Sequence, residues 1–264
     1  MPFGGKGQTI SGASSSSSGS GAAVSLLFTA GSRPTSGAIR DLSERTGEFS
    51  VSFDPLPGNP DSSHGVSHWL EILASGLTYD LVGLAPGPPA ESPPRSRGLA
   101  SEDWVDAAEA VALRPGPHLA SGAGMVPVVR MLASLAAELS GLKGVVAVAW
   151  HPARCWSAPE VFRENVGRWI EGGVFPGLTL ASVALSPDRG LHSEGLALFT
   201  GQELRLEPEI VEDRTEAVKL AVRLLDFLVE HGRVHASQTV VGPGGMALRI
   251  EPSENGRFVR VCRG

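Results

Sequence analysis

The segment from Gly144 to Gly177 constrains the fold of this chain more than any other stretch of the sequence. Its apolar run Val145–Trp150 predicts a strand that is covered on both faces. The pattern from Ser157 to Glu160 predicts a capping box, in which serine and glutamate side chains satisfy free N–H groups of a helix. The run Leu178–Leu185 predicts a second strand. Together they predict a crossover unit, which is right-handed if both strands lie in one sheet.

Periodicity and turn residues predict the other elements. Continuous or alternating apolar residues favour strands at 23–30, 49–54 and 110–113, a strand pair joined near Gly76, and three C-terminal strands at 238–241, 246–250 and 258–261. Helical spacing and capping residues favour helices at 36–46, capped by Ser36, at 125–141, and from Asp213 to about Gly232.

This mixture predicts an α+β fold, with a mixed sheet or sheets, crossover helices and a C-terminal antiparallel hairpin region. Each half can be written as a strand, a helix and two further strands, which raises the alternative of two fused ferredoxin-like halves. We expect a disordered Gly/Ser-rich tail over 1–21, because it cannot bury enough apolar surface to offset the entropy lost on ordering. An N-terminal half over 22–143 and a C-terminal half over 144–264 then follow, packed as one globular unit.

Composition narrows the function classes. The formal net charge of −6 argues against a nucleic-acid partner, since phosphates are bound by basic surfaces. Two cysteines, Cys155 and Cys262, are too few for a secreted disulfide scaffold. No apolar run is long enough to span a membrane, and the N-terminus lacks the apolar stretch of a signal peptide. These features predict a soluble cytoplasmic protein that needs no cofactor.

His151 and Cys155 are the first candidates for chemistry. They follow a buried strand and precede a helix, the position at which open α/β sheets place ligand sites. A helix N-terminus also lowers the pKa of a thiol, which suits a Cys/His nucleophilic pair. The alternative is structural: Trp150 and Trp156 flank the pair as packing residues would. The pair alone offers too few ligands for a metal.

A second candidate is the glycine-rich stretch before the helix at 125–141. Free N–H groups there could hold an anion near His118, Ser121, Gly122 and Gly124. The stretch lacks the lysine of a phosphate-binding loop and the spacing of a dinucleotide fingerprint. A glycine-lined helix start packed on the sheet is the alternative.

Two further sets of polar residues have structural alternatives. His64 and His68 are four residues apart, as two metal ligands on a helix would be, but their surroundings favour a polar loop. Glu203, Glu207 and Glu209 could supply a carboxylate pair for acid/base catalysis. A solvated strand face, with an arginine between two of the acids, explains the same pattern. The sequence predicts no metal site.

A set of turn and core residues in the C-terminal half follows the pattern of a known family: Trp150, Ser157, Pro159, Glu160, Phe162, Gly195, Leu196, Phe199, Gly201, Glu203, Gly232, Thr239 and Gly242. On these residues the chain resembles the bacterial domain of unknown function 4261, over about residues 145–249. The sequence departs from that family at His235, where the family has an Asp-Gly turn. The resemblance implies a soluble bacterial α+β protein without an established activity.

The sequence therefore favours a non-enzymatic binding or protein-interaction module, because core and turn signals are complete while no catalytic constellation is. A protein partner would bind around the loop Ala85–Gly98. A toxin-neutralising protein is one version that the acidic charge permits. The alternative is a hydrolase or transferase that uses His151 and Cys155. No feature predicts the oligomeric state.

Overall fold

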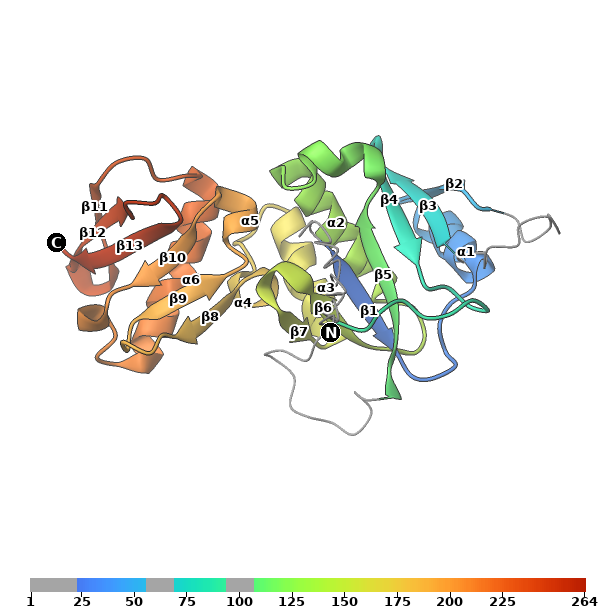
Figure 1. Ribbon diagram of the computed structural model, residues 1–264, viewed down its shortest axis with the longest axis horizontal. Coiled ribbons are helices and arrows are strands. Elements are labelled where there is room, and N and C mark those ends of the chain that lie inside the picture. The colour runs from blue at the N-terminus through green and yellow to red at the C-terminus, as the bar shows by residue number, and fades with distance from the viewer. Residues whose placement is uncertain (1–22, 56–68, 94–106) are drawn as a thin grey trace, which may run out of the picture.

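The computed structural model describes residues 23–55, 69–93 and 107–264, and it has an α+β fold with two sheets (Figure 1). The expected tail at 1–21, the histidines His64 and His68, and most of the second half of the loop Ala85–Gly98 lie outside these residues. In the described part of the chain, no helix has both the length and the apolar content to cross a bilayer.

The first sheet has seven strands in the order β2-β3-β4-β5-β1-β6-β7, and every neighbouring pair is antiparallel. Strand β1 lies between β5 and β6 and is buried along its whole length, since both faces of the sheet are covered there. The strands are β1 (Val24–Phe28), β2 (Ser50–Phe53), β3 (Trp69–Ala74), β4 (Leu77–Val82), β5 (Glu109–Pro115), β6 (Val145–Trp150) and β7 (Cys155–Ser157).

The second sheet has six strands in the order β11-β12-β13-β10-β9-β8. Strands β10 and β13 are parallel, whereas the other neighbours are antiparallel, so the predicted C-terminal hairpins are confirmed. The strands are β8 (Ser182–Leu185), β9 (Leu191–Glu194), β10 (Glu203–Leu206), β11 (Gln238–Val241), β12 (Ala247–Pro252) and β13 (Phe258–Arg263).

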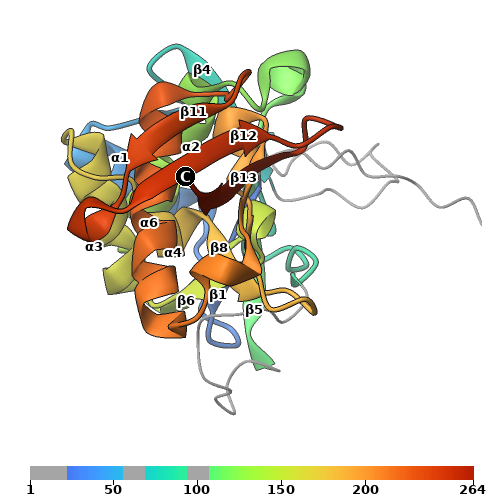
Figure 2. The same cartoon turned by 90° about the vertical axis from the view of Figure 1, so that its left-hand side faces the viewer.

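The main helices cover one side of both sheets, as Figures 1 and 2 show together. Helices α2 and α3 pack on the first sheet and α6 packs on the second. The α-helices are α1 (Ser36–Thr46), α2 (Val126–Leu139), α3 (Pro159–Ile170), α4 (Gly177–Leu180), α5 (Ala197–Thr200) and α6 (Arg214–His231). Short 3-10 turns include η2 (Pro117–Gly122), η3 (His151–Ala153), η4 (Pro208–Ile210) and η5 (Pro243–Gly245).

One continuous apolar core lies between the helices and both sheets. Where the sheets meet, three aromatic rings from α3, the following loop and α5 pack edge to face. The ring of Trp169 lies 5.5 Å from that of Phe175 and 6.0 Å from that of Phe199, and the last two rings are 4.9 Å apart. Such pairs add to the stability that burial alone provides. The two sheets are therefore joined through a packed core.

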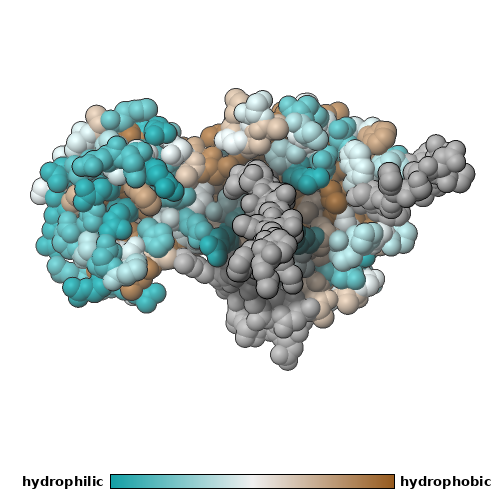
Figure 3. Space-filling model, viewed as in Figure 1, coloured by the Kyte–Doolittle hydropathy of each residue, from teal (hydrophilic) through white to brown (hydrophobic). Residues whose placement is uncertain are grey.

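The opposite sides of the two sheets differ from each other. On the six-stranded sheet, this side carries ion pairs among Arg205, Glu207 and Arg260, and hydrophilic residues dominate it in Figure 3. On the seven-stranded sheet this side carries several alanines of the central strands, and the loop after β4 covers part of it. The Ala90 N–H donates to the Ala110 carbonyl at 2.9 Å. A small second core of Leu27, Ala110, Ala147, Ala149 and Trp156 lies there.

Three local predictions for residues 144–185 are wrong. The N-cap of α3 is Ala158, and no side chain caps the helix, because Ser157 belongs to β7 and pairs with Val148. The run expected as one strand begins as the helix α4, and only its second half is a strand. Strands β6 and β8 lie in different sheets, so no crossover joins them within one sheet.

Two other expectations need adjustment. Thr35 rather than Ser36 caps α1, since its hydroxyl accepts the Ala38 N–H at 3.3 Å. The division between 143 and 144 falls inside the seven-stranded sheet, where β6 pairs with β1, and the change of sheet comes after α3. Ferredoxin-like halves are not confirmed, because the sheets differ in strand number and order.

Candidate functional site

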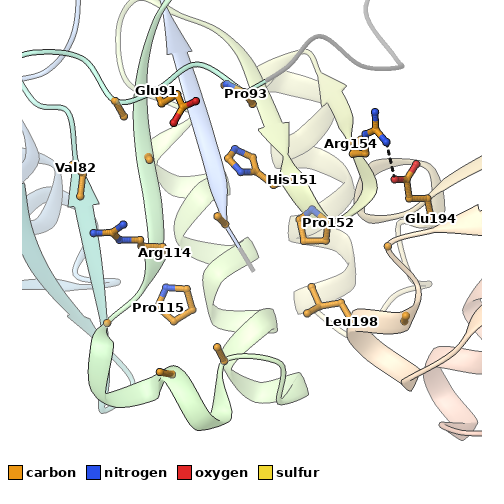
Figure 4. Close-up of a pocket in the computed structure, with 18 of the residues that line it drawn as sticks. Val82, Glu91, Pro93, Arg114, Pro115, His151, Pro152, Arg154, Glu194 and Leu198 are labelled. Atoms are coloured by element: carbon orange, nitrogen blue, oxygen red, sulfur yellow. Dashed lines mark ion pairs between the residues drawn. The ribbon is translucent and has the colours of Figure 1, made fainter. Parts of the chain in front are cut away.

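A cleft of about 1150 Å³ lies where the two sheets meet, and four separate parts of the chain supply most of its lining. They are the loop Ala90–Pro93, the end of β5 with η2, the η3 turn with Arg154, and the connection from β9 to α5. Figure 4 shows Arg114 and Glu91 on one side of this cleft, Arg154 and Glu194 on the other, and His151 between them.

Small residues and one close backbone contact create this space. Ala23 and Ala112 line the cleft on the seven-stranded sheet, so little side-chain volume fills it. On the other side, Gly195 approaches Ala153 so closely that a Cβ atom at Gly195 would lie 2.9 Å from the Ala153 Cα. The connection from β9 to α5 is therefore packed directly against η3.

His151 is held at the wall of the cleft by a buried serine. Its Nε2 atom lies 2.9 Å from the Ser25 Oγ, and Ser25 is fully buried in β1. Burial lowers the pKa of His151, which favours the neutral imidazole. Because solvent does not reach Ser25, this hydroxyl positions the ring and is not an accessible nucleophile.

Cys155 lies in β7, and its side chain faces the main core instead of the cleft. The thiol donates to the Leu178 carbonyl at 3.4 Å, and the residue is only 5% exposed. Burial raises the pKa of Cys155, which is the opposite of what a nucleophilic thiol requires. His151 and Cys155 thus have different hydrogen-bond partners and only the histidine lines the cleft.

We predict that Cys155 resists thiol reagents in the native protein. In a Cys262→Ser variant, alkylation by iodoacetamide should be roughly a hundredfold or more slower than that of a free thiol, because it requires local opening. Labelling should reach completion in denaturant. Mass spectrometry after timed quenching measures both rates. Rapid native labelling of Cys155 would contradict this placement and revive the thiol-enzyme alternative.

Each wall of the cleft carries an arginine whose ion pair is long. Arg154 Nη1 lies 3.5 Å from Glu194 Oε1, across the junction of the sheets, and Arg114 Nε lies 3.7 Å from Asp80 Oδ2. Arg154 also has a left-handed backbone at φ 50° and ψ 45°, which costs about 1–2 kcal/mol for a residue other than glycine. Both arginine side chains are more than half exposed.

Glu203 has a structural role at the edge of the cleft. Its Oε1 accepts the N–H groups of Gly195 at 2.9 Å and Ala197 at 3.1 Å, and its Oε2 accepts the Leu196 N–H at 3.2 Å. The Ser193 hydroxyl also donates to Oε2. This carboxylate thereby holds the connection from β9 to α5. The sequence had suggested a solvated strand face, but the carboxylate of Glu203 faces backbone N–H donors.

The other two glutamates lie away from the cleft. Glu207 is buried and forms ion pairs with Arg260 at 2.6 Å and with Arg205 at 3.4 Å. Glu209 lies exposed in the first turn of η4. The three glutamates therefore do not form one carboxylate site.

The glycine-rich stretch borders the cleft through other residues than expected. His118 is hydrogen-bonded to the Thr78 hydroxyl, and Ser121, Gly122 and Gly124 do not line the cleft. Their neighbours Ala120 and Ala123 do. Two of the sites that the sequence predicted, the loop after β4 and His151, therefore line one cleft. The third, the glycine-rich stretch, borders the same cleft through Ala120 and Ala123.

Neither Cys155 nor Ser25 offers a nucleophile to the cleft, because both residues are buried. Among residues 23–55, 69–93 and 107–264, no group of three or more His, Cys, Asp or Glu side chains is arranged to hold a metal. The sequence reasoning missed Ser25, Asp80 and Arg114. The signal that could have found them is a polar residue within, or at the end of, a mainly apolar strand.

Comparison with known proteins gives no relative from which a function could be transferred. No protein-family model, no curated protein and no solved structure matches the chain. The resemblance to the domain of unknown function 4261 is therefore neither supported nor contradicted.

Proposed function

We propose that this chain is a non-enzymatic binding module whose ligand lies in the cleft between the two sheets. The observation that carries the proposal is the convergence of four distant segments on one space of about 1150 Å³. Ligand sites are concave, mainly apolar and furnished with a few placed polar groups. Here alanines and prolines form about half of the lining. The polar groups are His151, two arginines, one serine and three glutamates (Arg114, Arg154, Ser92, Glu91, Glu194 and Glu203).

Two features support binding over catalysis. Cys155 is buried with its thiol directed at a carbonyl, and Ser25 is closed to solvent, so neither offers a nucleophile to the cleft. The histidine is fixed by a serine behind it, as a hydrogen-bonding contact for a ligand would be. A positioned neutral imidazole can both donate and accept, depending on its tautomer.

Filling the cleft tests the proposal. Ala112 is half-buried on the cleft wall, so Ala112→Phe places a ring in the ligand space, whereas Ala30→Phe adds the same ring at an exposed turn. A fragment library is screened by ligand-observed NMR against each protein. We expect fragments that bind the wild type and the Ala30→Phe variant, with affinity reduced at least tenfold in Ala112→Phe.

Circular dichroism and urea midpoints serve as controls for folding of both variants. Fragments that bind Ala112→Phe as tightly as the wild type would exclude the cleft as their site. A wild type that binds no fragment would contradict the proposed function itself.

A further inference from the structure

Asp80 and Arg114 form an unusual pair on the wall of the cleft. They face each other across β4 and β5, with 3.7 Å between Asp80 Oδ2 and Arg114 Nε, too long for a hydrogen bond. The Asp80 side chain is 9% exposed and that of Arg114 is 59% exposed. The charge of the nearly buried Asp80 carboxylate is thus compensated by the guanidinium of Arg114, whose side chain extends into the solvent of the cleft. In Figure 4 this guanidinium lies beside Val82.

The groups around Asp80 make its charge costly. Glu71 on β3 is its direct cross-strand partner, and like charges in that position destabilise a sheet. Burial raises the pKa of Asp80 and Glu71 raises it further, whereas Arg114 and His118 on η2 oppose the rise. Glu71 itself accepts the Ser52 hydroxyl at 2.7 Å. Arg114 is the arginine that compensates Asp80 within the described chain.

Arg114 has unused capacity for an anion. A guanidinium has five N–H donors arranged to match a carboxylate or phosphate, and within the described chain those of Arg114 make no hydrogen bond of normal length. Three apolar residues, Val82, Ala112 and Pro115, line the same wall, and Glu91 of the loop after β4 lies on the same side of the cleft. An anionic group joined to an apolar body would fit both features.

We infer that Arg114 is the anion-recognising residue of the cleft, and that the ligand is an organic carboxylate with an apolar body. The inference rests on the proposed function, because it names the ligand class of the same cleft. When the ligand carboxylate pairs with Arg114, Asp80 loses its compensating cation. Asp80 then takes up one proton from solvent, so the buried site stays neutral.

Isothermal titration with benzoate between pH 5 and pH 8 tests this inference. Repeating it in two buffers of different ionisation enthalpy counts the protons bound with the ligand. We expect the affinity of the wild type to rise as the pH falls, by up to tenfold per pH unit where Asp80 is ionised in the free protein and protonated in the complex. Proton uptake should approach one per benzoate in that range.

Variants separate the two residues. Asp80→Asn should bind benzoate at least tenfold more tightly than the wild type at pH 7.5, with no proton uptake. Arg114→Gln should lose at least tenfold at every pH, and Arg114→Lys, which keeps the charge without the fork, tests the same contact if the glutamine variant does not fold. Arg249→Gln, at an exposed ion pair of the six-stranded sheet that does not line the cleft, is the matched control and should change affinity less than threefold.

Several results would overturn the inference. They are benzoate binding that Arg114→Gln leaves unchanged, a wild type that binds benzoate without proton uptake, and no benzoate binding at all. Proton uptake that persists in Asp80→Asn would assign it to His118 or His151, which His118→Gln and His151→Gln would then distinguish. Tight binding of inorganic phosphate in place of benzoate would refute the organic carboxylate. If fragments still bind and Ala112→Phe still abolishes their binding, the proposed function stands although this inference fails.

Discussion

Replacing Gly195 by alanine should lower the free energy of unfolding by about 2–5 kcal/mol and disrupt the cleft. Gly195 has φ +98°, a left-handed conformation that side chains rarely adopt. A Cβ atom there would also lie 2.9 Å from the Cα and Cβ atoms of Ala153, which is itself fully buried. Backbone atoms cannot rotate away as a side chain can. Urea denaturation, read as a shift in midpoint at constant slope, measures the loss.

Gly167 provides a matched control for this substitution. It lies inside α3, and a Cβ atom there would meet no atom within 4 Å. Gly167→Ala should therefore raise stability by about 0.5–1 kcal/mol, because alanine restricts the unfolded chain and favours a helix. If both glycine variants have the same stability, Gly195 does not pack tightly against Ala153. A Gly195→Ala variant that still binds cleft ligands at wild-type affinity would show that the contact does not shape the cleft.

The sequence predicts secondary structure well where periodicity is long. Apolar residues spaced three and four apart predict helix α2. Two mainly apolar runs on either side of Gly76 predict the paired strands β3 and β4. The capping box fails because its pattern is short. Ser157 can cap a helix or continue a strand, and pairing with Val148 in β6 satisfies its backbone instead. A tertiary contact of this kind leaves no local signal.

Sheet membership is also invisible in the local pattern. The apolar run of β6 is typical of any buried strand, and its neighbours are decided by long-range pairing with β1. For the same reason the division of the chain cannot be placed from composition. The turn after β6 is correctly expected to carry His151, but the partner of that histidine is Ser25, more than a hundred residues earlier. The spacing of residues in the sequence can place a candidate side chain at the end of a strand. It cannot show which distant side chain will be its hydrogen-bond partner.

The difference between His151 and Cys155 comes from one geometric fact that the sequence does not carry. A strand sends alternate side chains to opposite faces. Because β7 begins at Cys155, the thiol enters the helix-covered core, while Trp156 packs on the opposite face. His151 and Cys155, although only four residues apart, therefore face different sides of the sheet: His151 lines the cleft and Cys155 lies in the main core. Reactivity follows from that placement, since the histidine alone meets the solvent of the cleft.

Glu203→Gln is expected to be the second large effect, with a loss of about 2–4 kcal/mol in the free energy of unfolding. The carboxylate accepts three backbone N–H groups and one hydroxyl from the connection between β9 and α5. A glutamine offers one accepting oxygen and an NH₂ group, and the latter faces donors that it cannot satisfy. Hydrogen bonds to a charged acceptor are also stronger than those to an amide.

Glu209→Gln is the matched control for the Glu203→Gln substitution. Glu209 is exposed and has no ion pair within residues 107–264, so its substitution should change stability by less than about 0.5 kcal/mol. Hydrogen exchange should further show faster exchange of the Gly195, Leu196 and Ala197 amides in Glu203→Gln, because these donors lose their acceptor. Equal effects of the two substitutions would mean that the carboxylate of Glu203 is solvated, and that the wall of the cleft is held by packing of Gly195 alone.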